Sequence, residues 1–226
     1  MIRRVYEQVL RVKAIGEIYV ATDDQRIFDH VESFGGKAMM TSPDHQSGTD
    51  RCAEVARQLN HPADILLNVQ GDEPFISGDH IEKVIHCFKK KGTLIASLVK
   101  KIDTLEDLLN KNIPKVVVDN YFQALYFSRT MIPDLRDIPQ TAWFSVHTFY
   151  KHIGIYGFKP EILKKIVRLP LGKLEQAERL EQLRWLENGY RIQLAETTLE
   201  NISVDTPQDL ENLQKKLLEN STLNKM

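Results

Sequence analysis

Short β-rich runs alternate with amphipathic helical stretches along most of the chain, and this alternation limits the possible folds more than any other feature. The apolar residues Ile2, Val5 and Val9 follow helical spacing. The run EIYVAT at 17–22 then has the composition of a short buried strand. Repeated β-α units joined by short turns predict an α/β fold with a mostly parallel sheet and helices on both faces.

The same reasoning assigns the remaining elements of the first half. We expect a helix from Asp24 that stops at Gly35-Gly36, because glycine commonly ends helices. The further predictions are strands at 37–42, 61–70 and 93–99, and helices from near Thr49, at 79–90 and at 104–110.

The second half has a different pattern. KVVVDN (115–120) and ALYFSR (124–129) are spaced like the two strands of a hairpin, so the sheet is expected to become mixed here. Residues 131–147 contain prolines and show no clear period. We then expect strands at 152–158 and 190–196, and helices at 160–168, 174–188 and 207–219. All of this fits a single domain over residues 1–226.

Composition narrows the class of protein. Thirty basic and thirty-one acidic residues give a formal net charge of -1, which does not favour nucleic acid or a membrane surface as a partner. Cys52 and Cys87 lie in amphipathic helical patterns and are predicted to be reduced thiols. No apolar run is long enough to span a bilayer, and residues 1–8 do not resemble a signal peptide. We therefore expect a cytoplasmic protein.

The segment NVQGDEP (68–74) follows a predicted buried strand, and open α/β sheets bind ligands at this end of their strands. Gly71 allows the backbone to turn or to approach a ligand closely. Asp72 and Glu73 place two carboxylates beyond the strand, where they suit a hard cation. A polar turn with solvated acids would have the same sequence.

A second acidic residue stands out in SVDTPQDL (203–210). Thr206, Pro207 and Asp209 fit the start of a helix. Asp205 has no part in that cap and ends the preceding strand. Together with Asp72 it suggests a Mg²⁺ site with two protein carboxylates, the other positions being left to phosphate oxygens and water.

The loop TSPDHQSGTDR (41–51) is rich in hydroxyl groups and runs into a predicted helix, so its amides and the positive end of that helix are suited to a nucleotide. Ser47 or Thr49 acting only as a helix cap explains the same residues. Arg129 ends a strand. His152, Gly154 and Tyr156 share one strand face, which suits a polyhydroxylated sugar, although a lone histidine is more often a core residue.

Seven motifs together resemble the CMP-Kdo synthetases, which activate the sugar acid Kdo. Their order matches that of the family, and they cover nearly the whole chain. NVQGDEP separates the chain from the sialic-acid cytidylyltransferases that share the fold. The motifs are VATDDQRI, GGKAMMTSPDHQSGTDR, NVQGDEP, ALYFSR, HIGIYGF, LEQLRWLENGYRI and SVDTPQDL.

The resemblance implies a nucleotide-diphospho-sugar transferase-like fold, a homodimer, Mg²⁺, and the reaction of CTP with Kdo to give CMP-Kdo and pyrophosphate for lipopolysaccharide synthesis. It also implies a small antiparallel extension for sugar binding and dimerisation at about 115–160. Asp72 and Asp205 match the metal-binding aspartates, and Gln70 a residue between nucleotide and sugar. The sugar pocket matches Arg129, His152, Tyr156, Glu181 and Gln182, and the loop near cytosine matches Ser47, Gly48 and Thr49.

The sequence departs from the family pattern at its start. Family members place a strand and a basic loop of the type IPARxxSxRxPGKPL before the helix that begins here at Met1. A wrongly chosen start, a trimmed chain and a short natural product all fit this departure. Because that loop grips the triphosphate, we expect residues 1–226 alone to have little or no activity. The alternatives to a Kdo enzyme are a cytidylyltransferase for a related keto sugar acid, such as 8-amino-Kdo, and a non-catalytic remnant.

Overall fold

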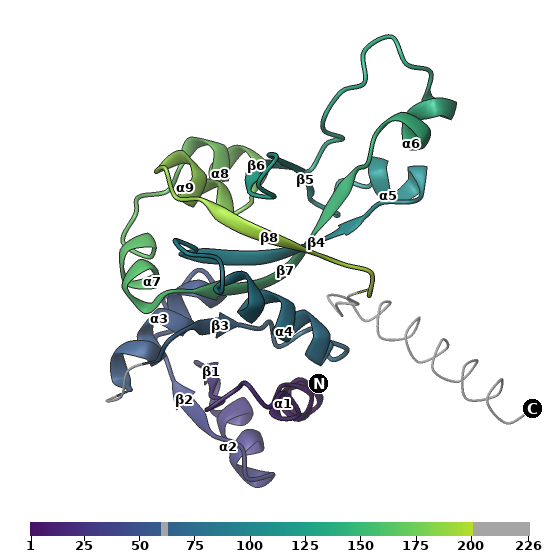
Figure 1. The fold of residues 1–226 in the computed structure, drawn as a ribbon. Coiled ribbons are helices and arrows are strands. Elements are labelled where there is room, and N and C mark those ends of the chain that lie inside the picture. The colour runs from purple at the N-terminus through teal and green to yellow at the C-terminus, as the bar shows by residue number, and fades with distance from the viewer. Residues whose placement is uncertain (60–62, 201–226) are drawn as a thin grey trace, which may run out of the picture.

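The computed structural model describes residues 1–59 and 63–200. Its centre is a six-stranded mixed sheet in the order β6-β5-β7-β4-β8, with β3 pairing to β7 as well (Figure 1). The strands are β3 (Leu66–Asn68), β4 (Ile95–Lys101), β5 (Lys115–Val118), β6 (Ala124–Ser128), β7 (Tyr150–Phe158) and β8 (Ile192–Thr197).

Strand β7 organises this sheet, because it pairs antiparallel with β3, β4 and β5. The β5–β6 hairpin is antiparallel as predicted, and β8 runs parallel to β4. The centre of the sheet is apolar on both sides, so Ile95, Leu98 and Val99 of β4 are fully buried. The predicted α/β class with a mixed sheet flanked by helices is confirmed, but the expected predominance of parallel pairing is not, because only β4 and β8 pair in parallel within the described part of this sheet.

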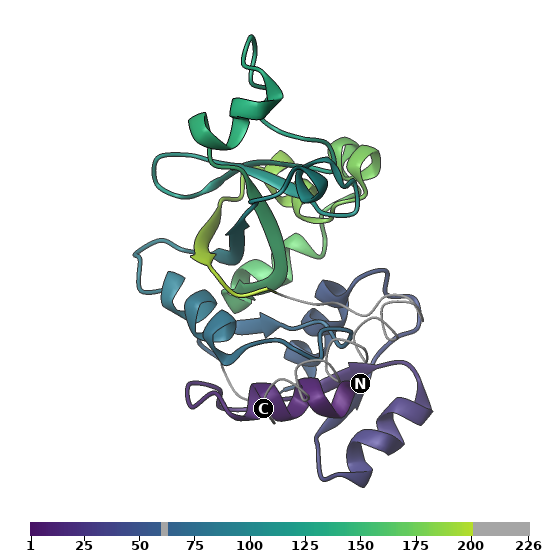
Figure 2. The same ribbon diagram turned by 90° about the vertical axis from the view of Figure 1, so that its right-hand side faces the viewer.

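A second, two-stranded sheet holds β1 (Val20–Thr22) and β2 (Ala38–Met40), which pair in parallel. It lies with α1 (Ile2–Leu10) and α2 (Gln25–Ser33) at one end of the molecule, and the segment between β6 and β7 projects from the other end (Figure 2). Within the described residues β1 pairs only with β2, and β3 only with β7.

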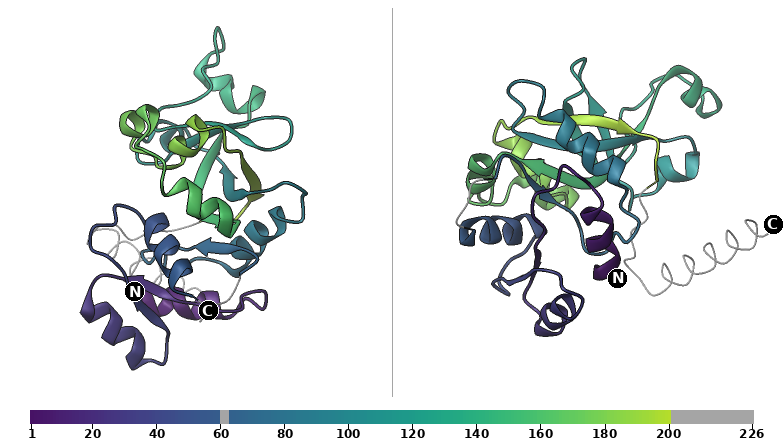
Figure 3. Two further views of the ribbon diagram at one scale, coloured as in Figure 1. Left: turned by 90° about the vertical axis from the view of Figure 1, so that its left-hand side faces the viewer. Right: turned by 60° about the horizontal axis from the view of Figure 1, so that its bottom comes forward.

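Helices cover both faces of the central sheet. Helix α4 (Gly78–Cys87) lies with α1 on one face of the sheet (Figure 3). There Val5, Val9, Ile81 and Val84 share a core. Helices α3 (Gly48–Gln58), α7 (Pro160–Ile166) and α9 (Gln182–Glu187) contribute to the other face, and α8 (Lys173–Glu178) packs against α9. The short helix α5 (Leu105–Leu109) closes a smaller cluster around Phe149.

The expectation of one helix at 174–188 is wrong. Arg179 adopts a left-handed conformation with φ of 55°, which ends α8 and lets α9 begin at Gln182 in a new direction. The expectation of an irregular 131–147 needs a smaller correction, because a 3-10 turn (Gln140–Ala142) and α6 (Trp143–Val146) form there. The helix predicted at 207–219 lies outside the described residues. No helix in the described part of the chain is long and apolar enough to cross a membrane.

Candidate active site

The amino end of α3 approaches the end of β3 closely. Ser47 caps α3 by accepting a hydrogen bond from the Asp50 amide, at 3.1 Å from the Ser47 hydroxyl. A Cβ on Gly48 would lie 3.0 Å from Nε2 of Gln70 and 3.3 Å from the amide group of Asn68. Glycine therefore lets the loop approach these two amides closely, since a Cβ would require them to shift by a few tenths of an ångström.

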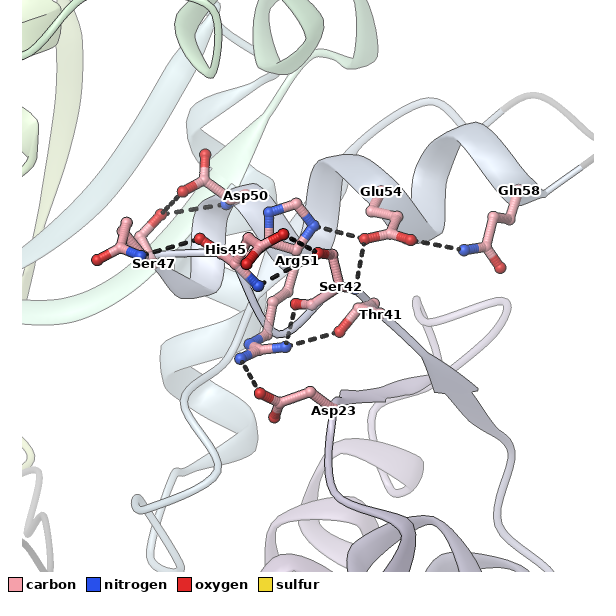
Figure 4. Close-up of polar contacts among 11 residues, drawn as sticks. Asp23, Thr41, Ser42, His45, Ser47, Asp50, Arg51, Glu54 and Gln58 are labelled. Atoms are coloured by element: carbon pink, nitrogen blue, oxygen red, sulfur yellow. Dashed lines mark hydrogen bonds and ion pairs between the residues drawn. The ribbon is translucent and has the colours of Figure 1, made fainter.

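The loop before α3 is fixed by its own polar contacts (Figure 4). Arg51 bonds Asp23 at 3.0 Å and donates to the Thr41 hydroxyl at 2.8 Å. The Ser42 amide donates to Glu54 at 2.9 Å, and His45 contacts the same carboxylate. These bonds tie the loop to β1, β2 and α3, so the backbone amides at the start of α3 are held in place.

Glu181 joins the two halves of the chain. Its two carboxylate oxygens accept hydrogen bonds from the Ser47 hydroxyl at 2.9 Å and the Thr49 hydroxyl at 2.7 Å. Burial raises the pKa of Glu181, while the hydrogen bonds from Thr49 and Ser47 oppose that rise. A half-buried carboxylate at the amino end of α3 also suits the positive end of the helix dipole.

The end of β3 lies directly beside this carboxylate. Asn68 is buried, accepts a hydrogen bond from Gln70 at 3.1 Å, and donates to the Thr49 hydroxyl at 3.5 Å. In the β3–β7 ladder, Asn68 is also the direct partner of Tyr156. Asn68 therefore connects the α3 loop with the polar face of β7.

The polar face of β7 is lined by aromatic rings. The rings of His152 and Tyr156 are 5.2 Å apart, and Trp185 of α9 lies 5.0 Å from Tyr156. The Tyr156 hydroxyl is buried and has no hydrogen-bond partner in the described part of the chain. Burial, followed by the nearby Glu181 carboxylate, raises the Tyr156 pKa well above its usual value.

The charge state of His152 is also set by burial. Burial lowers the pKa of His152 to about 3, so the imidazole is neutral at physiological pH. Its Nε2 atom lies 2.9 Å from the hydroxyl of Ser97 on β4. A neutral imidazole offers one donor and one acceptor to its surroundings.

Arg129 follows β6 and packs against the junction of α8 and α9. Its guanidinium donates to the carbonyl oxygens of Glu178, Arg179 and Lys111, at 2.7, 3.2 and 3.2 Å respectively. The Glu178 carboxylate in turn accepts from the Arg129 amide at 2.9 Å. Among residues 1–59 and 63–200, these bonds use three of the five guanidinium N–H groups, which leaves two for a ligand.

The structure brings most of the predicted site residues into one region. Ser47, Thr49 and Glu181 are in direct contact, Gly48 lies against Gln70, and Gln182 is a buried residue that follows Glu181. Of the other predicted sugar-pocket residues, His152 and Tyr156 lie on β7, and Arg129 follows β6.

Only one of the two predicted metal-binding aspartates lies within the described residues. Asp72 is half-buried, two residues beyond Gln70, and Asp205 lies outside the described residues. Within the described residues no group of three or more His, Cys, Asp or Glu side chains is arranged to hold a metal ion.

Sequence reasoning missed several polar residues that support this region. Glu178 belongs to no predicted site, yet it accepts from the Ser128 hydroxyl at 2.7 Å and from the Arg129 amide. Ser97 is fully buried in β4. A serine within the apolar run LIASLV was the available signal, because a buried hydroxyl needs partners.

Comparison with known proteins identifies the family. The sequence profile described as Cytidylyltransferase matches residues 1–202. The 3-deoxy-manno-octulosonate cytidylyltransferase of Phocaeicola vulgatus is 51% identical over 213 residues, which are 93% of this chain and 84% of that protein. This chain belongs to the CMP-Kdo synthetase family.

Other comparisons agree with membership of the CMP-Kdo synthetase family. The enzyme of the same name from Thermodesulfovibrio yellowstonii is 46% identical over 221 residues, covering 95% of this chain and 87% of the relative. A solved CMP:2-keto-3-deoxy-manno-octonic acid synthetase complexed with CTP superposes with a TM-score of 0.88 and 38% identity, covering 97% of this chain and 88% of that one. A 4-diphosphocytidyl-2C-methyl-D-erythritol synthase from Anaerococcus prevotii shares the fold, with a TM-score of 0.62, 17% identity, and coverage of 96% and 88%.

Proposed function

We propose that this member of the CMP-Kdo synthetase family transfers CMP from CTP to the anomeric hydroxyl of Kdo, releasing pyrophosphate. The observation that carries the proposal is the junction at Glu181, where the hydroxyl-rich loop of α3 meets the helix that flanks β7. The proposed nucleotide loop and the proposed sugar face are thereby held beside one another. Relatives that share about half of its residues carry the name of this activity.

The nucleotide is proposed to bind at the start of α3 and the end of β3. Ser47, Gly48 and Thr49 supply hydroxyl groups and a closely approaching backbone, and Gln70 follows directly on β3. The positive end of α3 favours a negatively charged ligand. Gln70 lies between this loop and β7, where a side chain contacts both nucleotide and sugar.

The sugar acid is proposed to bind along β7 and the start of α9. The two unused N–H groups of Arg129 suit the sugar carboxylate, because a guanidinium binds carboxylates through parallel hydrogen bonds. The Tyr156 hydroxyl and His152 suit sugar hydroxyl groups. Glu181 and Gln182 complete the pocket from α9.

Magnesium is proposed as the cofactor, held by Asp72 and Asp205. Their carboxylate oxygens are hard donors of the kind that Mg²⁺ prefers, and Asp72 lies at the carboxyl end of β3, on the same segment as Gln70. When bound, the ion would neutralise charge on the phosphate groups of CTP.

The reaction forms one bond and breaks one bond. The anomeric oxygen of Kdo attacks the α-phosphorus of CTP in line, the bond from that phosphorus to the β-phosphate oxygen breaks, and pyrophosphate leaves. The hydroxyl proton passes to solvent. His152 is a poor general base because its pKa of about 3 leaves it little affinity for a proton at neutral pH. The protein contributes mainly position and charge.

A homodimer and a cytoplasmic location are further parts of this proposal, as is a role in supplying activated Kdo for lipopolysaccharide synthesis. The segment between β6 and β7 projects from the body and exposes Phe144 and Val146 (Figure 2). Exposed apolar side chains on a projecting arm are suited to a contact between two copies. Light scattering at several protein concentrations tests this state, and a monomer at every concentration would contradict it.

A kinetic experiment tests the proposed activity on the protein as its gene encodes it. With CTP, Mg²⁺ and Kdo, wild-type protein should release pyrophosphate, and Asp72→Ala should lower kcat by about 1,000-fold, because a lost metal ligand removes several kcal/mol of transition-state stabilisation. Asp29→Ala, at an exposed position on α2 where the carboxylate bonds Gln25, is the control and should be unaffected. Full turnover by Asp72→Ala would refute the assigned metal site. Preference for 8-amino-Kdo over Kdo in a competition assay would reassign the substrate.

A further inference from the structure

The antiparallel pairing of β7 with β4 is irregular at one point. The β4–β7 register pairs Leu98 with Ile153 but Ser97 with Tyr156, so Gly154 and Ile155 have no partners on β4. This bulge frees carbonyl groups of β7 from the regular ladder. It keeps His152 and Tyr156 on the same face, because two extra residues preserve the alternation of side chains.

The Ser97 hydroxyl fills the gap at this bulge. Its oxygen lies 2.8 Å from the Ile155 carbonyl oxygen, 3.2 Å from the Ile153 carbonyl oxygen and 2.9 Å from Nε2 of His152. Ser97 is fully buried, so these three atoms are the partners that the described structure gives to its hydroxyl. A hydroxyl group has one proton to donate and lone pairs to accept with.

Proton counting assigns the role of each partner. Carbonyl oxygens only accept, so the Ser97 proton is directed to the Ile155 carbonyl, which is the nearer of the two. The ring nitrogen of His152 must then donate to the Ser97 oxygen. Were Nε2 the acceptor instead, the Ser97 proton would be drawn away and the two buried carbonyls would face oxygen lone pairs without a donor.

We propose that Ser97 is a positioning residue that fixes His152 as the Nε2–H tautomer, so that Nδ1 presents a lone pair to a hydroxyl group of the sugar acid. This inference rests on the proposed function for the identity of the ligand, but the tautomer follows from the protein alone. It assigns His152 the role of a hydrogen-bond acceptor, which the sequence motif leaves undefined. A hydroxyl donor is accordingly selected at this point of the pocket.

The surroundings of the ring support a single orientation. Phe127 packs edge-on against His152 with centroids 5.1 Å apart, and Tyr156 lies against it at 5.2 Å. Burial keeps the imidazole neutral, as the lowered pKa of His152 indicates, so the tautomer persists across the physiological range. The ring is thus held by packing and its proton by Ser97.

Nuclear magnetic resonance of ¹⁵N-histidine-labelled protein without substrate tests the tautomer directly. Nε2 of His152 should give the signal of a protonated ring nitrogen and Nδ1 that of an unprotonated one, an assignment made by comparison with His152→Gln. In Ser97→Ala the two signals should move toward a mixture of tautomers, whereas Ser97→Thr, which keeps the hydroxyl group, should retain the wild-type signals. A protonated Nδ1 in the wild type would overturn the proposal.

Kinetics test the consequence for substrate. Ser97→Ala should raise KM for Kdo about five- to tenfold and leave KM for CTP unchanged, because one neutral hydrogen bond to the sugar is weakened. Ser97→Thr should restore the wild-type KM. An unchanged KM for Kdo in Ser97→Ala whose tautomer has become mixed would contradict the positioning role. Absence of turnover with Kdo in wild-type protein that shows the expected tautomer would instead contradict the proposed function.

Discussion

The two sides of the candidate site satisfy their polar groups differently. At the amino end of α3, the hydroxyl groups of Ser47 and Thr49 already donate to the Glu181 carboxylate. On the face of β7, the Tyr156 hydroxyl is buried without a hydrogen-bond partner in the described residues. The first side is internally complete, and the second has an unmet hydrogen-bonding requirement.

This difference separates stability from binding. A ligand at the α3 end must exchange hydrogen bonds that the folded chain already makes, so substitutions there should weaken both folding and binding. A ligand on β7 supplies bonds that folding does not provide, and an unsatisfied buried polar group costs about 1–3 kcal/mol. Substitutions on β7 should therefore weaken binding while leaving the fold as stable as before, or more so.

Among the residues of these two sides, the largest effect is expected at Glu181, which belongs to both. Glu181→Ala removes the acceptor for two hydroxyl groups and a wall of the sugar pocket, so kcat/KM should fall roughly 100-fold, as two charge-assisted hydrogen bonds would allow. Steady-state kinetics with both substrates measure this. Glu187→Gln on the same helix, whose carboxylate contacts the Leu174 amide instead, is the control. Equal losses in both variants would show that helix damage, not the junction, is responsible.

The pH dependence of stability sharpens the prediction for Glu181. Because burial raises its folded-state pKa, the protonated form stabilises the fold, and that contribution is lost as pH rises from below 4.5 through the raised value. Glu181→Gln should therefore gain stability relative to the wild type as pH increases over this window. Urea unfolding between pH 4 and 7 measures the difference. A difference independent of pH would contradict the buried, charged junction.

The next largest effect is expected at Tyr156. Tyr156→Phe should raise KM for Kdo by about five- to tenfold through loss of one hydrogen bond, and should increase the free energy of unfolding by about 1 kcal/mol, because a buried unpaired hydroxyl is removed. Urea unfolding and initial rates measure the two quantities. Tyr150→Phe is the control, because it removes a hydroxyl that has a partner in the wild type, Glu196 at 3.4 Å. Loss of stability in Tyr156→Phe would break the comparison.

A smaller effect is expected at the cap of α3. Ser47→Ala should lower the free energy of unfolding by about 1 kcal/mol, as loss of a helix cap does, and raise KM for CTP about threefold. Ser77→Ala removes the equivalent cap of α4, outside the candidate site, and should cost similar stability with no change in KM. If the two variants behave alike in kinetics, Ser47 has no role beyond capping.

The smallest effect concerns pH and the imidazole of His152. Because the pKa of this group is lowered to about 3, the imidazole stays neutral from pH 5 to pH 8. A plot of kcat/KM for Kdo against pH should therefore show no inflection from His152 in this range. Rate profiles of the wild type and His152→Gln should therefore have the same shape. An inflection near pH 6.5 that disappears in His152→Gln would contradict this assignment.

The sequence predicted the helices and strands that depend on local patterns. Asp24 and Ser47 cap their helices as such residues commonly do, and the 115–129 hairpin follows from the spacing of its strands. The break between α8 and α9 was not foreseeable, because Arg179 takes a left-handed conformation in a stretch without glycine or proline. Tertiary packing overrides local preference there.

Pairing across long sequence separations also escapes pattern reading. The alternation in β7 predicted that His152 and Tyr156 share a face, and the rings do lie together. It gave no sign that β3 would pair antiparallel with β7, which sets Asn68 beside Tyr156. The hydrogen bonds of Ser97 depend on a bulge whose register is fixed only when β4 and β7 meet.

The identity of the product tests the account most directly. Phosphorus NMR should be recorded on a reaction mixture that contains the protein as its gene encodes it, CTP, Mg²⁺ and Kdo. A new phosphodiester signal and pyrophosphate should appear in equal amounts, and neither should appear without Kdo. Release of pyrophosphate without Kdo, or a phosphodiester that forms with another sugar acid but not with Kdo, would contradict the proposal that this site joins CMP to Kdo.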